Sequence, residues 1–103
     1  MYDKYNKKIL DYKDKNYFIV FYSPSCKFSV NAITLLETKN ISFKGYNIDN
    51  IKGNRKRLLH FLKQQKDITS FDEQHKTIPI IFYKGKFIGG FSELESYLNN
   101  LKI

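Results

Sequence analysis

The chain has 103 residues, of which 42% are hydrophobic and 17% aromatic, and its formal net charge is +8. This length suits one domain over residues 1–103, and this composition excludes a disordered chain. No apolar run approaches the roughly 18 residues of a membrane span, and the charged N-terminus lacks a secretory leader pattern. A single cysteine cannot close an internal disulfide, so we expect a cytoplasmic protein without a membrane partner.

Positive charge is densest in the segment KGNRKRLLHFLKQQK, residues 52–66. Such a run occurs on surfaces that bind nucleic acid or acidic partners, and also on ordinary solvated helix faces. Lysine, asparagine, isoleucine and tyrosine are frequent along the whole chain. The run therefore reflects background composition, and it does not favour nucleic acid as a partner.

The first half of the chain predicts a helix followed by a β-α-β unit. Apolar residues at helical spacing predict a helix over Tyr2–Asp14. The run NYFIVFY, residues 16–22, is apolar on both faces, as is typical of a central buried strand, and Ser23-Pro24 ends it. A helical period then predicts a helix from Cys26 to about Lys39 and a strand over 41–49. Because a helix connects these strands, we expect them to be parallel.

The second half predicts a helix, a loop and a hairpin before the last helix. Leucine and phenylalanine at helical spacing indicate a helix near Gly53–Lys66, and the polar stretch 67–76 is typical of a loop. Strands at Ile80–Tyr83 and Lys86–Ile88 then flank a tight turn. We therefore expect an antiparallel pair here.

The last helix, over 92–101, is predicted to start with a capping box between Ser92 and Glu95. With it the order of elements becomes α-β-α-β-α-β-β-α. This order predicts an α/β fold with a small mixed four-stranded sheet, flanked by helices on both faces.

Cys26 falls where the buried strand ends and the next helix begins. The first N–H groups of a helix are unpaired and carry partial positive charge. They stabilise a thiolate and lower its pKa from about 8.5 into the range of roughly 3.5–7.5, and Lys27 adds a positive neighbour. Cys26 is therefore the candidate catalytic residue, with a space-filling buried cysteine as the alternative. No clustered ligands accompany it, so we expect no protein-only metal site.

Three pieces of the chain resemble the glutaredoxins of the thioredoxin-like superfamily. They are the strand and loop VFYSPSCKFS, the tripeptide TIP in KTIPIIFYKGKFIGGFSEL, and GKFIGG followed by Phe91-Ser92-Glu93. The match runs from the first strand to the last helix. It implies the thioredoxin-like (glutaredoxin) fold, a cis bond at Pro79 as in the family's Thr-Val-Pro, and a Gly-Gly turn that binds glutathione.

The resemblance implies glutathione as the cofactor. The backbone of Ile78 would pair with this extended peptide beside Cys26. One carboxylate of glutathione would lie at the start of the last helix, and the other would meet Lys76 or a basic residue of the helix near Gly53–Lys66. The residues implied in binding are Lys27, Phe28, Lys76, Thr77, Ile78, Pro79, Gly90, Phe91, Ser92 and Glu93. In the simpler alternative, Thr77, Ile78 and Pro79 only start a strand, Gly90 only forms a turn, and Ser92 only caps a helix.

The sequence departs from the family at the tetrad Cys26-Lys27-Phe28-Ser29. Dithiol glutaredoxins carry Cys-Pro-Tyr-Cys, so the resolving cysteine is absent. A one-cysteine route remains, in which Cys26 takes glutathione from a mixed disulfide and a second glutathione releases it. The monothiol class with Cys-Gly-Phe-Ser binds a [2Fe–2S] cluster between two subunits. Lys27 in place of glycine and the short loop before Cys26 argue against a cluster here, and Ser23 replaces a lysine common in the family.

We expect a glutathione-dependent thiol–disulfide oxidoreductase that acts on glutathionylated or disulfide proteins. One alternative is a cluster-binding protein with little turnover, and a homodimer is expected only with a cluster bound. The other alternative is a binding module of the same fold without chemistry. The segment Ser70–His75 looks inserted, as a lid, a partner surface or a neutral insertion, and His75 is interpreted as an ordinary loop residue.

Overall fold

The computed structural model describes residues 4–51 and 54–101. One four-stranded sheet has the order β2-β1-β3-β4, with β1 and β2 parallel and the other two pairs antiparallel. The predicted mixed sheet is confirmed. The elements are α1 (Lys4–Leu10), β1 (Phe18–Tyr22), α2 (Lys27–Thr38), β2 (Phe43–Asn47), η1 (Ile48–Asn50), α3 (Asn54–Gln64), α4 (Lys66–Thr69), β3 (Ile80–Tyr83), β4 (Lys86–Gly89) and α5 (Phe91–Leu101).

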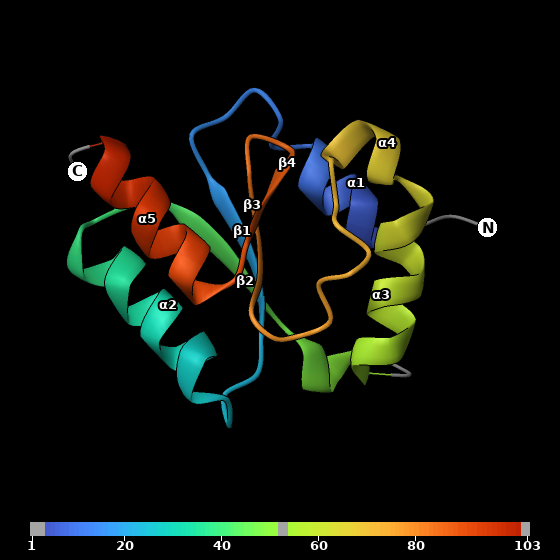
Figure 1. Ribbon diagram of the computed structural model, residues 1–103, viewed down its shortest axis with the longest axis horizontal. Coiled ribbons are helices and arrows are strands. Elements are labelled where there is room, and N and C mark those ends of the chain that lie inside the picture. Colours follow the sequence, from blue (N-terminus) through green and yellow to red (C-terminus); the bar gives the residue numbers. More distant parts are fainter. Residues whose placement is uncertain (1–3, 52–53, 102–103) are drawn as a thin grey trace.

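Helices cover both faces of the sheet, as predicted. Figure 1 shows α2 and α5 on one side of the strands and α1, α3 and α4 on the other. Side chains of β1 alternate between these layers, which explains why its sequence is apolar throughout. Phe18 and Val20 pack towards α2 and α5, whereas Ile19 and Phe21 pack towards α1 and α3. Within the described residues, no helix is both long and apolar enough to cross a membrane.

Two predicted elements are shorter in the structure. The helix predicted over Tyr2–Asp14 ends at Leu10 and continues as turns, and its first two residues lie outside the described part. The strand predicted over 41–49 spans only Phe43–Asn47, and η1 begins at the next residue. The Asn47 side chain accepts a hydrogen bond from the Asp49 N–H at 2.9 Å. This local bond replaces strand pairing and turns the chain. The predicted start of the third helix at Gly53 also lies outside the described residues.

The stretch 67–76 is not simply a polar loop, and that prediction is wrong. Its first residues belong to α4, and Ser70, the C-cap that follows this helix, lies in the left-handed region with φ 63°. Phe71 is only 4% exposed, and its ring lies 5.0 Å from Phe87 and 6.2 Å from Phe82. The Lys86 ammonium also donates to the Ile68 carbonyl at 2.6 Å. Apolar burial and this bond anchor the segment to the sheet. These contacts do not support the interpretation of Ser70–His75 as a lid.

The start of α5 also differs from the prediction. The helix begins at Phe91, so Gly90 is the N-cap and Ser92 lies at the second helical position. The Glu93 carboxylate accepts the Gly90 N–H at 2.7 Å. This is the glutamate half of a capping box, placed two residues before the predicted Ser92–Glu95 pair. Glycine is accepted at an N-cap, which permits the earlier start.

Candidate functional site

Cys26 is the N-cap of α2, as the sequence predicts. Its backbone is extended, with φ −97° and ψ 120°, and its carbonyl accepts the first helical bond from Val30 at 3.0 Å. The Cys26 N–H donates to the Ser23 carbonyl at 3.0 Å, which closes a turn across Pro24. The thiol is partly exposed. The strand break at Ser23-Pro24 therefore delivers the thiol to the unpaired N–H groups of the helix.

Ser29 lies one turn into α2 and is fully buried. Its hydroxyl oxygen accepts a hydrogen bond from the Ser23 N–H at 3.2 Å. This bond ties the end of β1 to the helix and fixes the hydroxyl close to the thiol. Ser25 is exposed, and its hydroxyl lies 3.0 Å from that of Ser23.

The surroundings of Cys26 favour its thiolate. Burial raises the pKa of the thiol, but hydrogen bonds from the Ser29 N–H, the Ser29 hydroxyl and the Phe28 N–H lower it. The positive charge of Arg55 lowers it further, and the net pKa lies below the ordinary value. The direction is that expected for a helix N-terminus. Arg55 comes from α3 and was not singled out in the sequence.

Ser29→Ala is expected to raise the pKa of Cys26, because the thiolate loses the hydroxyl hydrogen bond. At neutral pH less thiolate is then present, so alkylation by iodoacetamide is slower and its pH profile moves to higher pH. The exposed Ser25→Ala variant is the matched control and should keep the wild-type profile. An unchanged profile in Ser29→Ala would show that the hydroxyl does not stabilise the thiolate.

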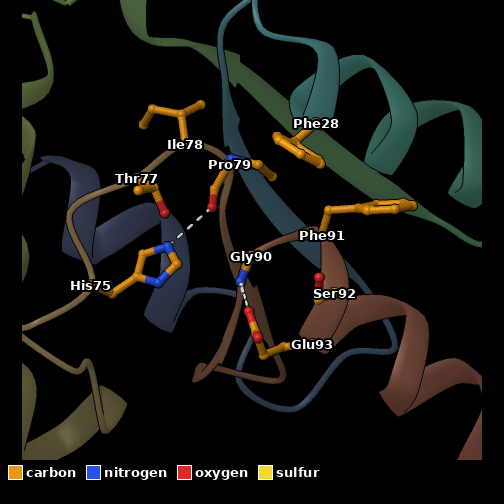
Figure 2. A pocket seen from close by; sticks show the side chains of 9 residues that line it. All are labelled: Phe28, His75, Thr77, Ile78, Pro79, Gly90, Phe91, Ser92 and Glu93. Carbon is orange, nitrogen blue, oxygen red and sulfur yellow. Dashed lines mark hydrogen bonds between the residues drawn. The ribbon is translucent and has the colours of Figure 1, made fainter.

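A pocket of about 220 Å³ opens between the loop before β3 and the start of α5 (Figure 2). The thiol lies near it, since the Cys26 S–H donates to the Ile78 carbonyl across 3.5 Å. Phe28 and Phe91 flank the pocket with ring centroids 6.4 Å apart, and Phe28 is 57% exposed. The lining residues are Phe28, His75, Thr77, Ile78, Pro79, Gly90, Phe91, Ser92 and Glu93.

Most residues predicted to bind glutathione meet in this pocket. All of them line it except Lys27 and Lys76, which are exposed beside Cys26 and Thr77 in the chain. The Ile78–Pro79 peptide is cis, as the resemblance implies. His75 also lines the pocket and is not the ordinary loop residue that the sequence predicts, because its Nε2 lies 3.2 Å from the Pro79 carbonyl oxygen. Its position two residues before Thr77 was the one available signal.

Comparison with known proteins agrees with this geometry. Residues 18–88 match the family model described as Glutaredoxin. The chain belongs to the glutaredoxin family. A probable glutaredoxin of Acanthamoeba polyphaga mimivirus is 46% identical to this glutaredoxin over 86 residues, which cover 84% of this chain and 81% of the relative. Family and fold together support a glutaredoxin-like redox function.

Solved glutaredoxins share the fold. The dithiolic glutaredoxin of Trypanosoma brucei brucei superposes with a TM-score of 0.66 at 25% identity, over 99% of this chain and 91% of that one. A buckwheat glutaredoxin–glutathione complex superposes with a TM-score of 0.68 at 19% identity, over 99% of this chain and 89% of that one. These likenesses confirm the predicted thioredoxin-like architecture.

Proposed function

We propose that this glutaredoxin catalyses glutathione-dependent thiol–disulfide exchange with Cys26 as its single nucleophile. The observation that carries the proposal is a thiol with a lowered pKa at the N-cap of α2, beside a pocket. The pocket has the mixed character that a small peptide needs, with aromatic walls and a helix N-terminus. The buckwheat protein of the same fold forms a complex with glutathione.

The exchange proceeds in two displacements. The Cys26 thiolate attacks the glutathione sulfur of a protein–glutathione mixed disulfide, and a bond forms between Cys26 and glutathione. The protein sulfur leaves as a thiolate and takes a proton from water. A glutathione thiolate then attacks the bound glutathione sulfur, which releases glutathione disulfide and the Cys26 thiolate. In total, the protein mixed disulfide is reduced to a thiol, and one glutathione supplies the electrons.

The pocket offers complementary groups to each part of glutathione. The N–H groups of Ser92 and Glu93 lie in the first turn of α5, where a helix attracts a carboxylate. The Glu93 carboxylate in the pocket wall suits the glutamyl ammonium group. Lys76 is exposed just before Thr77 and would meet the second carboxylate. With these assignments, the glutathione sulfur would lie near Ile78 and Cys26.

The proposal is tested by mixing the protein with a glutathionylated model protein and reduced glutathione. Glutathione disulfide should form, and a coupled assay with glutathione reductase should record it as oxidation of NADPH. In addition, mass spectrometry should find one glutathione on Cys26 when free glutathione is withheld. A protein that shows neither turnover nor this adduct would contradict the proposed exchange.

An iron–sulfur cluster shared by two subunits is the alternative chemistry for a one-cysteine site. No three His, Cys, Asp or Glu side chains gather into a metal site within residues 4–51 and 54–101. A cluster would therefore need glutathione and a second copy of Cys26, with the exposed Lys27 beside it. Anaerobic reconstitution with iron, sulfide and glutathione should leave a colourless monomer. A coloured dimer would make cluster binding the function instead.

A further inference from the structure

The segment that follows α4 ends with a histidine in the pocket wall. Figure 2 shows the His75 ring facing the Pro79 carbonyl, with Gly90 beside that carbonyl. Its Nε2 lies 3.2 Å from the Pro79 oxygen. A Cβ built on Gly90 would lie 3.4 Å from the His75 Cε1 atom and 3.6 Å from the Pro79 carbonyl oxygen. One edge of the His75 ring, the Pro79 carbonyl and Gly90 therefore meet at one corner of the pocket.

The hydrogen bond defines which nitrogen of the ring carries a proton. A backbone carbonyl can only accept, so Nε2 of His75 must be the donor to Pro79. Nε2 carries a proton in the corresponding neutral tautomer and in the imidazolium ion alike. The contact thus does not depend on ring protonation. A side-chain amide could make the same bond.

Aromatic packing also holds the His75 ring in place. The ring meets Phe87 edge-to-face, with centroids 5.1 Å apart and an interplanar angle of 68°. Phe71, which is buried, packs on the same Phe87 ring. The backbone before the histidine forms a hydrogen-bonded turn, because the His75 N–H donates to the Asp72 carbonyl at 2.9 Å. A side chain fixed in this way can hold a binding site in one geometry before the ligand arrives.

We propose that His75 is a positioning residue for glutathione binding. By holding the Pro79 carbonyl, it fixes the neighbouring Ile78, whose own carbonyl contacts the Cys26 thiol. By lying against Gly90, it closes the pocket next to the glutamyl end of the ligand. This role rests on the proposed function. It also means that the segment 70–76 holds one wall of the pocket in place.

The test compares variants of His75 and of a control histidine in the glutathione exchange assay. His75→Phe keeps the ring against Phe87 but removes the donor, and His75→Gln restores an N–H donor. His60→Phe is the matched control, because His60 is exposed on α3 and outside the pocket lining. His75→Leu is a second donor-free variant should His75→Phe not fold. Each variant is checked by thermal unfolding and by the alkylation rate of Cys26 with iodoacetamide.

In His75→Phe, KM for the glutathione mixed disulfide should rise roughly 3- to 10-fold, the loss expected for one hydrogen bond. The values of kcat and of the alkylation rate should stay within about twofold of wild type. His75→Gln should recover most of KM, and His60→Phe should match wild type. With a cysteamine mixed disulfide, which lacks the glutamyl and glycyl parts, His75→Phe and wild type should have equal KM.

An unchanged KM in His75→Phe would overturn the inference while leaving the proposed function intact. Failure of His75→Gln to recover KM would also overturn it, since the ring would then act through something other than its donor. A wild-type protein without turnover would instead overturn the proposed function, and the inference with it.

Discussion

Cys26→Ser is expected to reduce glutathione exchange to the uncatalysed rate. The thiolate is the attacking species, and a serine hydroxyl is neither ionised at neutral pH nor able to form a disulfide. The chain holds no other cysteine that could substitute. The measurement is the initial rate of glutathione disulfide formation with a glutathionylated protein, together with the mass of the protein after incubation.

The variant should remain folded, which makes the loss interpretable. The Cys26 S–H donates one weak contact, to the Ile78 carbonyl at 3.5 Å, and a serine hydroxyl is nearly the same size and can still accept from the N–H groups of Phe28 and Ser29. We expect a change of less than about 1 kcal/mol in the free energy of unfolding. Turnover that survived in a folded Cys26→Ser protein would show that another group carries the chemistry.

Gly89→Ala is expected to destabilise the protein by roughly 2–4 kcal/mol, from backbone strain and steric overlap together. Gly89 has φ +135°, which residues with a side chain rarely adopt. An added Cβ would also lie 2.6 Å from Cγ of Glu93, whose carboxylate accepts the Gly90 N–H at the start of α5. To relieve the overlap, Glu93 would have to leave the Gly90 N–H. Urea unfolding monitored by circular dichroism measures the loss.

The neighbouring glycine provides the matched control. In Gly90→Ala the nearest atoms would be 3.4 Å from the new Cβ, an ordinary van der Waals distance. The free energy of unfolding should change by no more than about 1 kcal/mol, the scale of an N-cap replacement. The methyl group would stand beside the pocket, so KM for glutathione mixed disulfides should rise. Equal losses of stability in the two variants would contradict this division of roles.

Much of the site follows from local sequence and from sheet geometry. The double-sided apolar run over Phe18–Tyr22 identifies the central strand, and Ser23-Pro24 stops it directly before Cys26. The antiparallel pairing of β1 with β3 brings the start of β3 next to the end of β1, and the thiol follows that end. The loop from Thr77 to Pro79 and the start of α5 can therefore be assigned to the pocket from the order of the helices and strands alone.

The rest depends on contacts between distant residues. Periodicity does not reveal that Phe71 docks on the sheet, because it is a lone aromatic in a polar stretch, and this docking places His75 in the pocket. The chain also offers two possible caps for α5, since a glutamate follows both Gly90 and Ser92 by three residues. Packing of the hairpin against Glu93 decides between them. The contribution of Arg55 arises from the fold in the same way.

The buried Ser29 in the first turn of α2 has a kinetic consequence for the proposed exchange. A cysteine at this position would attack a disulfide on Cys26 within the molecule, at a rate independent of concentration. With a hydroxyl there, any adduct on Cys26 decays only by a bimolecular encounter with an external thiol. Its half-life is then inversely proportional to the ambient thiol concentration. The glutaredoxin would stay loaded for longest when its surroundings are most depleted of reductant.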